Sequence, residues 1–192
     1  MATRSQAREA VIQLLYAYGS GNDGISKFIE QILEEQKIKN TQKEFAQTLF
    51  FGVLENLDEI DKRIKHQLKS WDFSRIGDIE RSILRLGTYE IIFSKIDKAV
   101  VINEALEIAK NFGNESSAKF INGVLDGISK NIKITLEDIE KELESQAKLE
   151  SKQLESDKKE IPAAPKQKFK QKFKKRLLFK KTQQKTIAKG KK

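Results

Sequence analysis

Several residue types that build catalytic or membrane-bound proteins are scarce in this sequence. Cysteine is absent from all 192 residues, which excludes disulfides and thiolate metal sites. Histidine occurs once, at His66, so neither a histidine-based triad nor a multi-histidine metal site can form. No apolar stretch approaches the ~20 residues of a membrane span, and the first residues lack the apolar run of a signal peptide. These absences predict a cytoplasmic protein.

Proline is nearly absent as well, and this favours helices. The only two prolines are Pro162 and Pro165, and an interior proline would cost a helix about 3 kcal/mol. Apolar residues recur every three or four positions along the first 130 residues, and the alternation typical of strands is missing. The sequence therefore predicts an all-α fold.

The periodicity places the helices, and single residues mark their ends. We expect helices over residues 3–18, 25–37, 41–68, 75–93, 99–112 and 116–128. Thr3 and Thr41 are the expected N-caps of the first and third helices, and Gly113 is the expected end of the fifth. Residues 75–93 are apolar on nearly all sides, which predicts a central helix. Trp71 is expected in the core or as a hydrophobic staple, and the spacing of Gly123 and Gly127 predicts a close helix contact.

The chain divides into three segments of different composition. Residues 1–130 are expected to form a globular helical domain, and residues 131–160 a charged, solvent-exposed amphipathic helix. Residues 161–192 carry thirteen Lys or Arg and no acid, whereas the other 160 residues carry 24 such cations and 28 acids. A segment with so few apolar residues per charge cannot form a core. This tail is therefore predicted to be disordered.

The tail is the part whose composition alone indicates nucleic-acid binding. Lysines neutralise phosphates, and the interleaved phenylalanines can stack on bases. The candidate RNA-binding residues here are Lys168, Phe169, Lys172, Phe173, Lys175 and Arg176. Adsorption to anionic lipid is the alternative.

Four strings in the first segment point to a known family. They are Ala-Arg-Glu-Ala at 7–10 with Leu-Tyr-Ala at 15–17, Ile-Glu-Arg-Ser-Ile-Leu-Arg-Leu-Gly-Thr-Tyr-Glu at 79–90, Ile-Asn-Glu-Ala-Leu-Glu-Ile-Ala-Lys at 102–110, and Lys-Phe-Ile-Asn-Gly-Val-Leu-Asp at 119–126. In this order and spacing they resemble the NusB family of bacterial transcription antitermination factors, over residues 1 to about 130.

The resemblance implies both a fold and a function. The fold would be two packed three-helix bundles. The function would be binding of the boxA element of ribosomal RNA transcripts as a heterodimer with the ribosomal protein NusE, within the antitermination complex that lets RNA polymerase read through terminators. The resemblance implies no reaction. It places Tyr16 and Glu80 on the NusE-facing surface; a half-buried core position is the alternative for Tyr16.

Candidate RNA contacts lie on three predicted helices. Arg4 and Arg8 are four residues apart near a helix N-terminus, where cations oppose the helix dipole by ~0.3–1 kcal/mol unless phosphates dock there. An ordinary solvated face is the alternative. Arg85 can reach a phosphate or pair with a nearby acid. Further along the chain, the candidates are Lys119, Phe120 and Asn122, which offer phosphate contact, base stacking and hydrogen bonds; a core position is the alternative for Phe120.

An enzyme is not expected. Gly19-Ser20-Gly21 lacks the strand and helix context of a phosphate-binding loop, so no cofactor, metal or small-molecule substrate is predicted. Two other functions remain open. One is an accessory domain related to those fused to ribosomal RNA methyltransferases, although the chain lacks a long downstream α/β domain. The other is an RNA-binding ribosome-assembly factor.

Overall fold

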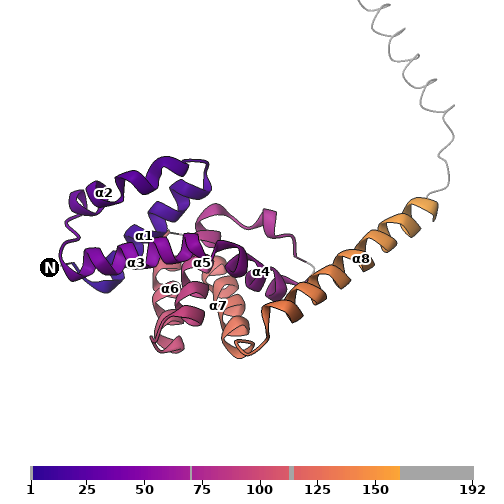
Figure 1. Ribbon diagram of the computed structural model, residues 1–192. Coiled ribbons are helices and arrows are strands. Elements are labelled where there is room, and N and C mark those ends of the chain that lie inside the picture. The colour runs from indigo at the N-terminus through magenta and orange to yellow at the C-terminus, as the bar shows by residue number, and fades with distance from the viewer. Residues whose placement is uncertain (1, 70, 113–114, 161–192) are drawn as a thin grey trace, which may run out of the picture. The chain divides into compact units, whose positions relative to one another are not determined.

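The computed structural model describes residues 2–69, 71–112 and 115–160. The chain divides into two units, Met1–Gln146 and Ala147–Lys192. Every regular element in the described residues is helical (Figure 1), which confirms the predicted all-α class. None of the described helices is long and apolar enough to cross a membrane. The candidate RNA-binding residues of the tail, 168–176, lie outside the described residues.

The N-terminal elements are α1 Arg4–Gly19, the 3-10 helix η1 Asp23–Phe28, α2 Ile29–Glu35 and α3 Thr41–Glu55. Thr3 caps α1 as predicted, because its hydroxyl accepts from the Gln6 N–H at 3.2 Å and its own N–H donates to the Gln6 side chain at 2.8 Å. The predicted helix over 25–37 is shorter and begins as 3-10. Thr41 is the first residue of α3 rather than its N-cap, and Asn40 takes the cap position.

The prediction of a single helix over 41–68 is wrong, because the helix is interrupted at one residue. This residue is Asn56, between α3 and α4 Leu57–Leu68. The Asn56 side-chain amide donates to the Gly52 carbonyl at 2.8 Å, so it competes for a helical acceptor. Apolar periodicity continues across the break, which is why it predicted one helix.

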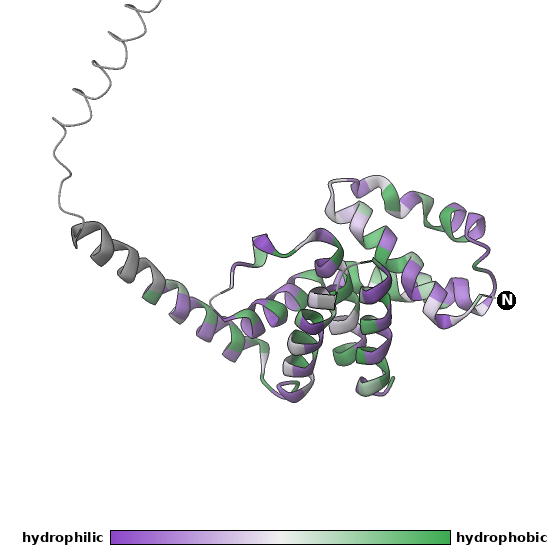
Figure 2. Cartoon of the chain, turned by 180° about the vertical axis from the view of Figure 1, so that it is seen from behind, coloured by the Kyte–Doolittle hydropathy of each residue, from purple (hydrophilic) through white to green (hydrophobic). Residues whose placement is uncertain are grey.

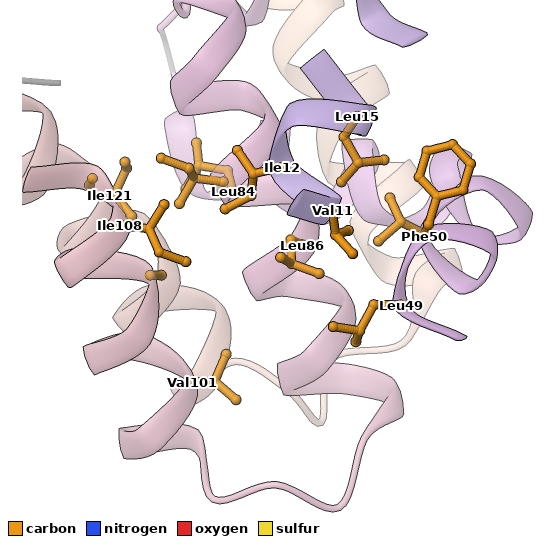
Figure 3. Packing of buried hydrophobic residues seen from close by; sticks show 14 of the residues in the cluster. Val11, Ile12, Leu15, Leu49, Phe50, Leu84, Leu86, Val101, Ile108 and Ile121 are labelled. Atoms are coloured by element: carbon orange, nitrogen blue, oxygen red, sulfur yellow. The ribbon is translucent and has the colours of Figure 1, made fainter. Parts of the chain in front are cut away.

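The central helix is α5 Asp78–Phe93, followed by α6 Lys98–Phe112 and α7 Glu115–Lys130. It packs against α1, α3, α4, α6 and α7, as the apolar residues around its whole circumference predicted. Figure 3 shows Leu84 and Leu86 of α5 among side chains of α1, α3, α6 and α7. Gly87 permits the close approach of α7, since a Cβ there would lie 2.9 Å from a Leu125 methyl.

The helices form two groups around this core. The first group is α1, α2 and α3, with η1 between α1 and α2. The second is α4, α5, α6 and α7. The resemblance implies three helices in each of the two bundles. Among the described residues, the second group has four. Most helices carry an apolar inner face and a polar outer face, which alternate in Figure 2.

The last helix, α8 Leu136–Glu160, begins within the first unit. Thr135 caps it, accepting from the Asp138 N–H at 3.2 Å. Ile139 is buried, and Lys62 of α4 donates to Glu140 at 2.8 Å. Asp58 and Glu140 raise the pKa of Lys62 through hydrogen bonds to its ammonium. The first turns of this helix are thus tied to α4 by an ion pair and bury Ile139, while most of their other residues are exposed or half-buried.

Candidate nucleic-acid interface

The start of α1 is occupied by an internal ion-pair network. Arg8 is only 4% exposed; its Nη2 lies 2.9 Å from Glu90 of α5, and its Nη1 lies 3.2 Å from Glu104 of α6. A second bond, from Nε, reaches Glu90 at 2.9 Å. The Arg8 guanidinium is therefore enclosed and bound to two carboxylates, which favours a structural role for Arg8 over the predicted RNA contact.

Arg4 is the exposed cation of this region. Its guanidinium carbon lies 5.1 Å from the centre of the Phe45 ring, and that of Arg8 lies 5.2 Å from the same centre. Both distances fit cation–π contacts. Of the two arginines predicted to bind RNA here, only Arg4 has its side chain at the surface.

Arg85 also pairs internally. Its Nε and Nη2 donate to the two carboxylate oxygens of Asp61 at 2.9 and 2.8 Å, and both side chains are largely covered, at 13% and 17% exposure. This bidentate geometry ties α5 to α4. It favours the alternative interpretation, in which Arg85 pairs with a nearby acid, over the predicted RNA contact.

The candidates on α7 lie at its surface. Lys119 and Asn122 are exposed. Phe120 is half-buried and packs against the core. Its position is therefore compatible with both interpretations, a core residue and an RNA contact. Gly123 is exposed, and a Cβ there would meet nothing within 4 Å. The expected close helix contact is therefore absent at Gly123 but present at Gly127, where a Cβ would lie 2.4 Å from a side chain of α4.

Trp71 is a candidate that sequence reasoning missed. It was expected in the core or as a staple, but it is 69% exposed and its ring stacks on Phe120, with centroids 6.0 Å apart and planes 26° apart. Its loop is ordered by Asp72, which accepts from the Ser74 N–H at 2.8 Å. Bonds from Ser74 lower the pKa of Asp72. Its place in the sequence could have indicated this exposure, because Trp71 falls between two periodic segments and outside either apolar stripe.

A cavity of about 280 Å³ lies beside this aromatic pair. Its lining consists of Trp71, Arg75, Ile76, Gly77, Glu80, Ser116, Ser117 and Phe120. The Ser117 hydroxyl donates to Glu80 Oε1 at 2.7 Å. The cavity thus combines two aromatic rings with a carboxylate, two hydroxyls and an arginine, contributed by α5, α7 and the loop that follows α4.

The two residues implied to face a partner protein have different surroundings. Tyr16 is 45% exposed on α1, which fits a contact surface better than the half-buried core position. Glu80 is partly covered and lines the cavity, whereas Tyr16 is not part of that lining.

Comparison with known proteins identifies the domain that carries this cavity. The model of the NusB family matches residues 5–130, which include every residue of the cavity. The chain belongs to the NusB family. It is 60% identical over 133 residues to the transcription antitermination protein NusB of Wolinella succinogenes, a match that covers 69% of this chain and 98% of that protein. The NusB of Nitratiruptor sp. is 62% identical over 133 residues, with 69% and 96% coverage.

Solved NusB structures share the fold. T. maritima NusB superposes with a TM-score of 0.63 at 40% identity, covering 67% of this chain and 92% of that one. A crystal structure of the antitermination factors NusB and NusE in complex with double-stranded RNA gives 0.61 at 31% identity, covering 66% and 96%. These likenesses agree with the family assignment.

Proposed function

We propose that this protein is a transcription antitermination factor that binds boxA-type RNA of ribosomal RNA transcripts together with NusE, and so promotes read-through by RNA polymerase. This role requires access to nascent transcripts, so the proposal includes a cytoplasmic location. The protein binds and assembles, and no reaction is part of the proposal.

One observation carries the RNA-binding part. Trp71 and Phe120 form a stacked pair with one ring 69% exposed, next to exposed Lys119 and Asn122 on α7. Exposed aromatic rings beside cations and amides are the groups that unstacked RNA bases and their phosphates require.

The relatives support the assembly part. The solved structure of NusB and NusE with double-stranded RNA shares this fold over 66% of the chain. The NusB of Wolinella succinogenes is matched over 98% of its own length, so that relative carries no further catalytic domain. This favours the antitermination role over an accessory domain of a methyltransferase. Tyr16, exposed on α1, is the residue that we propose for NusE contact.

The basic tail adds a separate contribution. Its thirteen cations and its phenylalanines, including Phe169 and Phe173, suit sequence-independent binding to the RNA backbone. Removal of residues 161–192 should weaken binding to all RNAs about equally and flatten the salt dependence. The preference for boxA should persist; its loss would contradict this division of labour.

The test is assembly of the full chain with purified NusE and a boxA oligoribonucleotide, measured by fluorescence anisotropy at several salt concentrations. We expect a ternary complex that prefers boxA over a scrambled sequence. Lys119→Ala should weaken RNA binding and reduce the salt slope by roughly one unit.

Lys130→Ala is the matched control, because Lys130 is an exposed cation at the opposite end of the same helix. It should leave affinity nearly unchanged. Absence of a complex with both RNA and NusE would overturn the proposed function, and equal effects of the two lysine variants would remove α7 from the interface.

A further inference from the structure

An open groove on the surface of α3 combines aromatic rings with carboxylates. Its volume is about 530 Å³, and it shares no lining residue with the cavity beside Trp71. Glu44, Phe51 and Glu55 of α3 line it, together with Tyr89 of α5. Two of its lining residues are acids, and none of the described residues that line it is a cation. No part of the proposed function uses this groove.

The aromatic part of the groove depends on a close approach of α3 and α5. Gly52 of α3 leaves room for the Tyr89 ring, since a Cβ at Gly52 would lie 2.2 Å from the Tyr89 hydroxyl oxygen. The Tyr89 ring stacks on Phe93 with centroids 5.4 Å apart. Phe93 is 41% exposed, and Phe51 is 39% exposed. Adjoining exposed rings favour a partner that covers them with apolar side chains.

The charge of the groove favours a cationic ligand. Glu44 and Glu55 are both exposed, and they are the first and last residues that α3 contributes to the lining. The cation next to Glu44 in the sequence is Lys43. It pairs instead with two acids of α2, with Glu34 at 3.0 Å and with Glu30 at 3.7 Å. A peptide in which lysines alternate with aromatic residues therefore matches both the charge and the rings of the groove.

A peptide of this composition occurs in the chain itself. Residues 166–179 contain seven Lys or Arg, three Phe and no acid. A segment tethered to its binding site has an effective concentration of up to roughly millimolar, so weak contacts are enough to hold it. We infer that the groove binds residues 166–179 of the same chain, with phenylalanine side chains on the exposed rings and lysines beside Glu44 and Glu55.

This contact goes beyond the proposed function and adds a competition to it. A lysine that neutralises a carboxylate of the groove is not available to a phosphate, so RNA and the groove compete for the same cations. RNA that binds the tail therefore releases it from the groove. The competition rests on the proposed binding of RNA by the tail, whereas the groove contact does not.

The absence of cysteine from the sequence allows a spin label to be placed at one chosen position. Gln171→Cys, within the proposed segment, carries a nitroxide in the isotope-labelled full chain, and the amide signals are recorded by nuclear magnetic resonance. The label should broaden the signals of Thr48 and Gly52 on α3. The signal of Gly123, on α7, is the control and should stay sharp. Salt should reduce the broadening, because it screens the attraction between exposed charges.

Substitutions in the groove separate a specific contact from attraction by net charge. Glu44→Gln combined with Glu55→Gln should lower the docking equilibrium constant by roughly two- to thirtyfold, the effect of two exposed ion pairs. Phe51→Ala should lower it by roughly two- to twelvefold, the effect of one aromatic contact. Glu35→Gln combined with Glu107→Gln is the matched control, because it removes two exposed acids outside the groove. It should leave the broadening unchanged.

Sharp signals at Thr48 and Gly52 in the spin-labelled chain would overturn the inference. Equal loss of broadening in the two double variants would also overturn it, because net charge alone would then hold the tail. In a mixture of spin-labelled chains with isotope-labelled chains that carry no spin label, the signals should stay sharp. Broadening there would assign the groove to the tail of a second copy instead.

A uridine oligoribonucleotide added to the spin-labelled chain tests the competition. It should restore the signals of Thr48 and Gly52. If the oligoribonucleotide binds, as measured by fluorescence anisotropy, and the signals stay broad, the competition is wrong. If it does not bind at all, the proposed binding of RNA by the tail is wrong, and the broadening without RNA still supports the groove contact.

Discussion

The start of α1 and the cavity beside Trp71 contain similar residues in opposite arrangements. At the start of α1 the Arg8 guanidinium is buried, where it pairs with Glu90 and Glu104 and lies over the partly buried Phe45 ring of α3. At the cavity one ring of the aromatic pair, that of Trp71, is exposed, and the Glu80 carboxylate lines an open space. Arginine, carboxylate and aromatic ring pack together inside the fold in the first region, and in the second they line the cavity that we propose as part of the RNA-binding surface.

The two regions differ in which polar groups and ring faces remain available to a ligand. A buried, bidentate ion pair has used its donors and acceptors, and opening it would expose uncompensated charges. The exposed face of Trp71 and the carboxylate of Glu80 border the cavity. The account therefore predicts that damage to the first region costs stability, whereas damage to the second costs RNA affinity.

The largest effect is expected at Arg8. Arg8→Ala leaves Glu90 buried without its partner, which should lower the free energy of unfolding by about 3–5 kcal/mol, measured by urea denaturation. Replacement of both partners by apolar residues, Arg8→Met with Glu90→Leu, should recover most of this loss. Arg4→Ala, at the exposed neighbour, should cost about 0.5–1 kcal/mol.

The comparison would fail if Arg8→Ala were as mild as Arg4→Ala. It would also fail if the folded fraction of Arg8→Ala lost RNA affinity by more than about twofold, the coupling expected between independent sites.

The next largest effect is expected at Trp71, and it concerns RNA affinity rather than stability. Trp71→Ala should weaken binding of single-stranded RNA by about 1–3 kcal/mol, the contribution of one stacked base, as measured by fluorescence anisotropy. Its unfolding free energy should fall by no more than about 0.5–1.5 kcal/mol, the worth of the lost ring contact. Phe28→Ala, at an aromatic residue 55% exposed on η1, is the control and should leave RNA affinity unchanged.

The smallest effect concerns the surface of α7. Gly123 is exposed within the helix and meets no neighbour, so Gly123→Ala should raise the unfolding free energy by about 0.8–1 kcal/mol. Gly87→Ala, where a Cβ meets Leu125 at 2.9 Å, should instead lower it. Denaturation of both variants checks the assignment; destabilisation by Gly123→Ala would show that the position is packed.

Sequence reasoning succeeded where the cause is local. Thr3 was predicted as the N-cap of α1, whose contact with Gln6 is only three residues away, and the all-round apolar pattern of 75–93 predicted a central helix. It failed where the partner is distant. Glu90 lies 82 residues from Arg8, and no helical spacing reveals that pair.

The same limit explains the cavity. Lys119, Phe120 and Asn122 were predicted from their place at the start of a helix and from family resemblance. Trp71 was missed because composition favours burial of a tryptophan, and its exposure depends on how the loop between α4 and α5 meets α7. The place of Glu80 in the cavity could not be predicted either, since its neighbour Ser117 is 37 residues away.

Side-chain footprinting by hydroxyl radicals tests the central comparison most directly, because it reads both regions in one sample. The full chain is oxidised with and without a boxA oligoribonucleotide, and the modification of Trp71, Phe120 and Phe45 is quantified by mass spectrometry. The account predicts that RNA protects Trp71 and Phe120 and leaves Phe45 unchanged. Protection of Phe45 with Trp71 still fully reactive would contradict it.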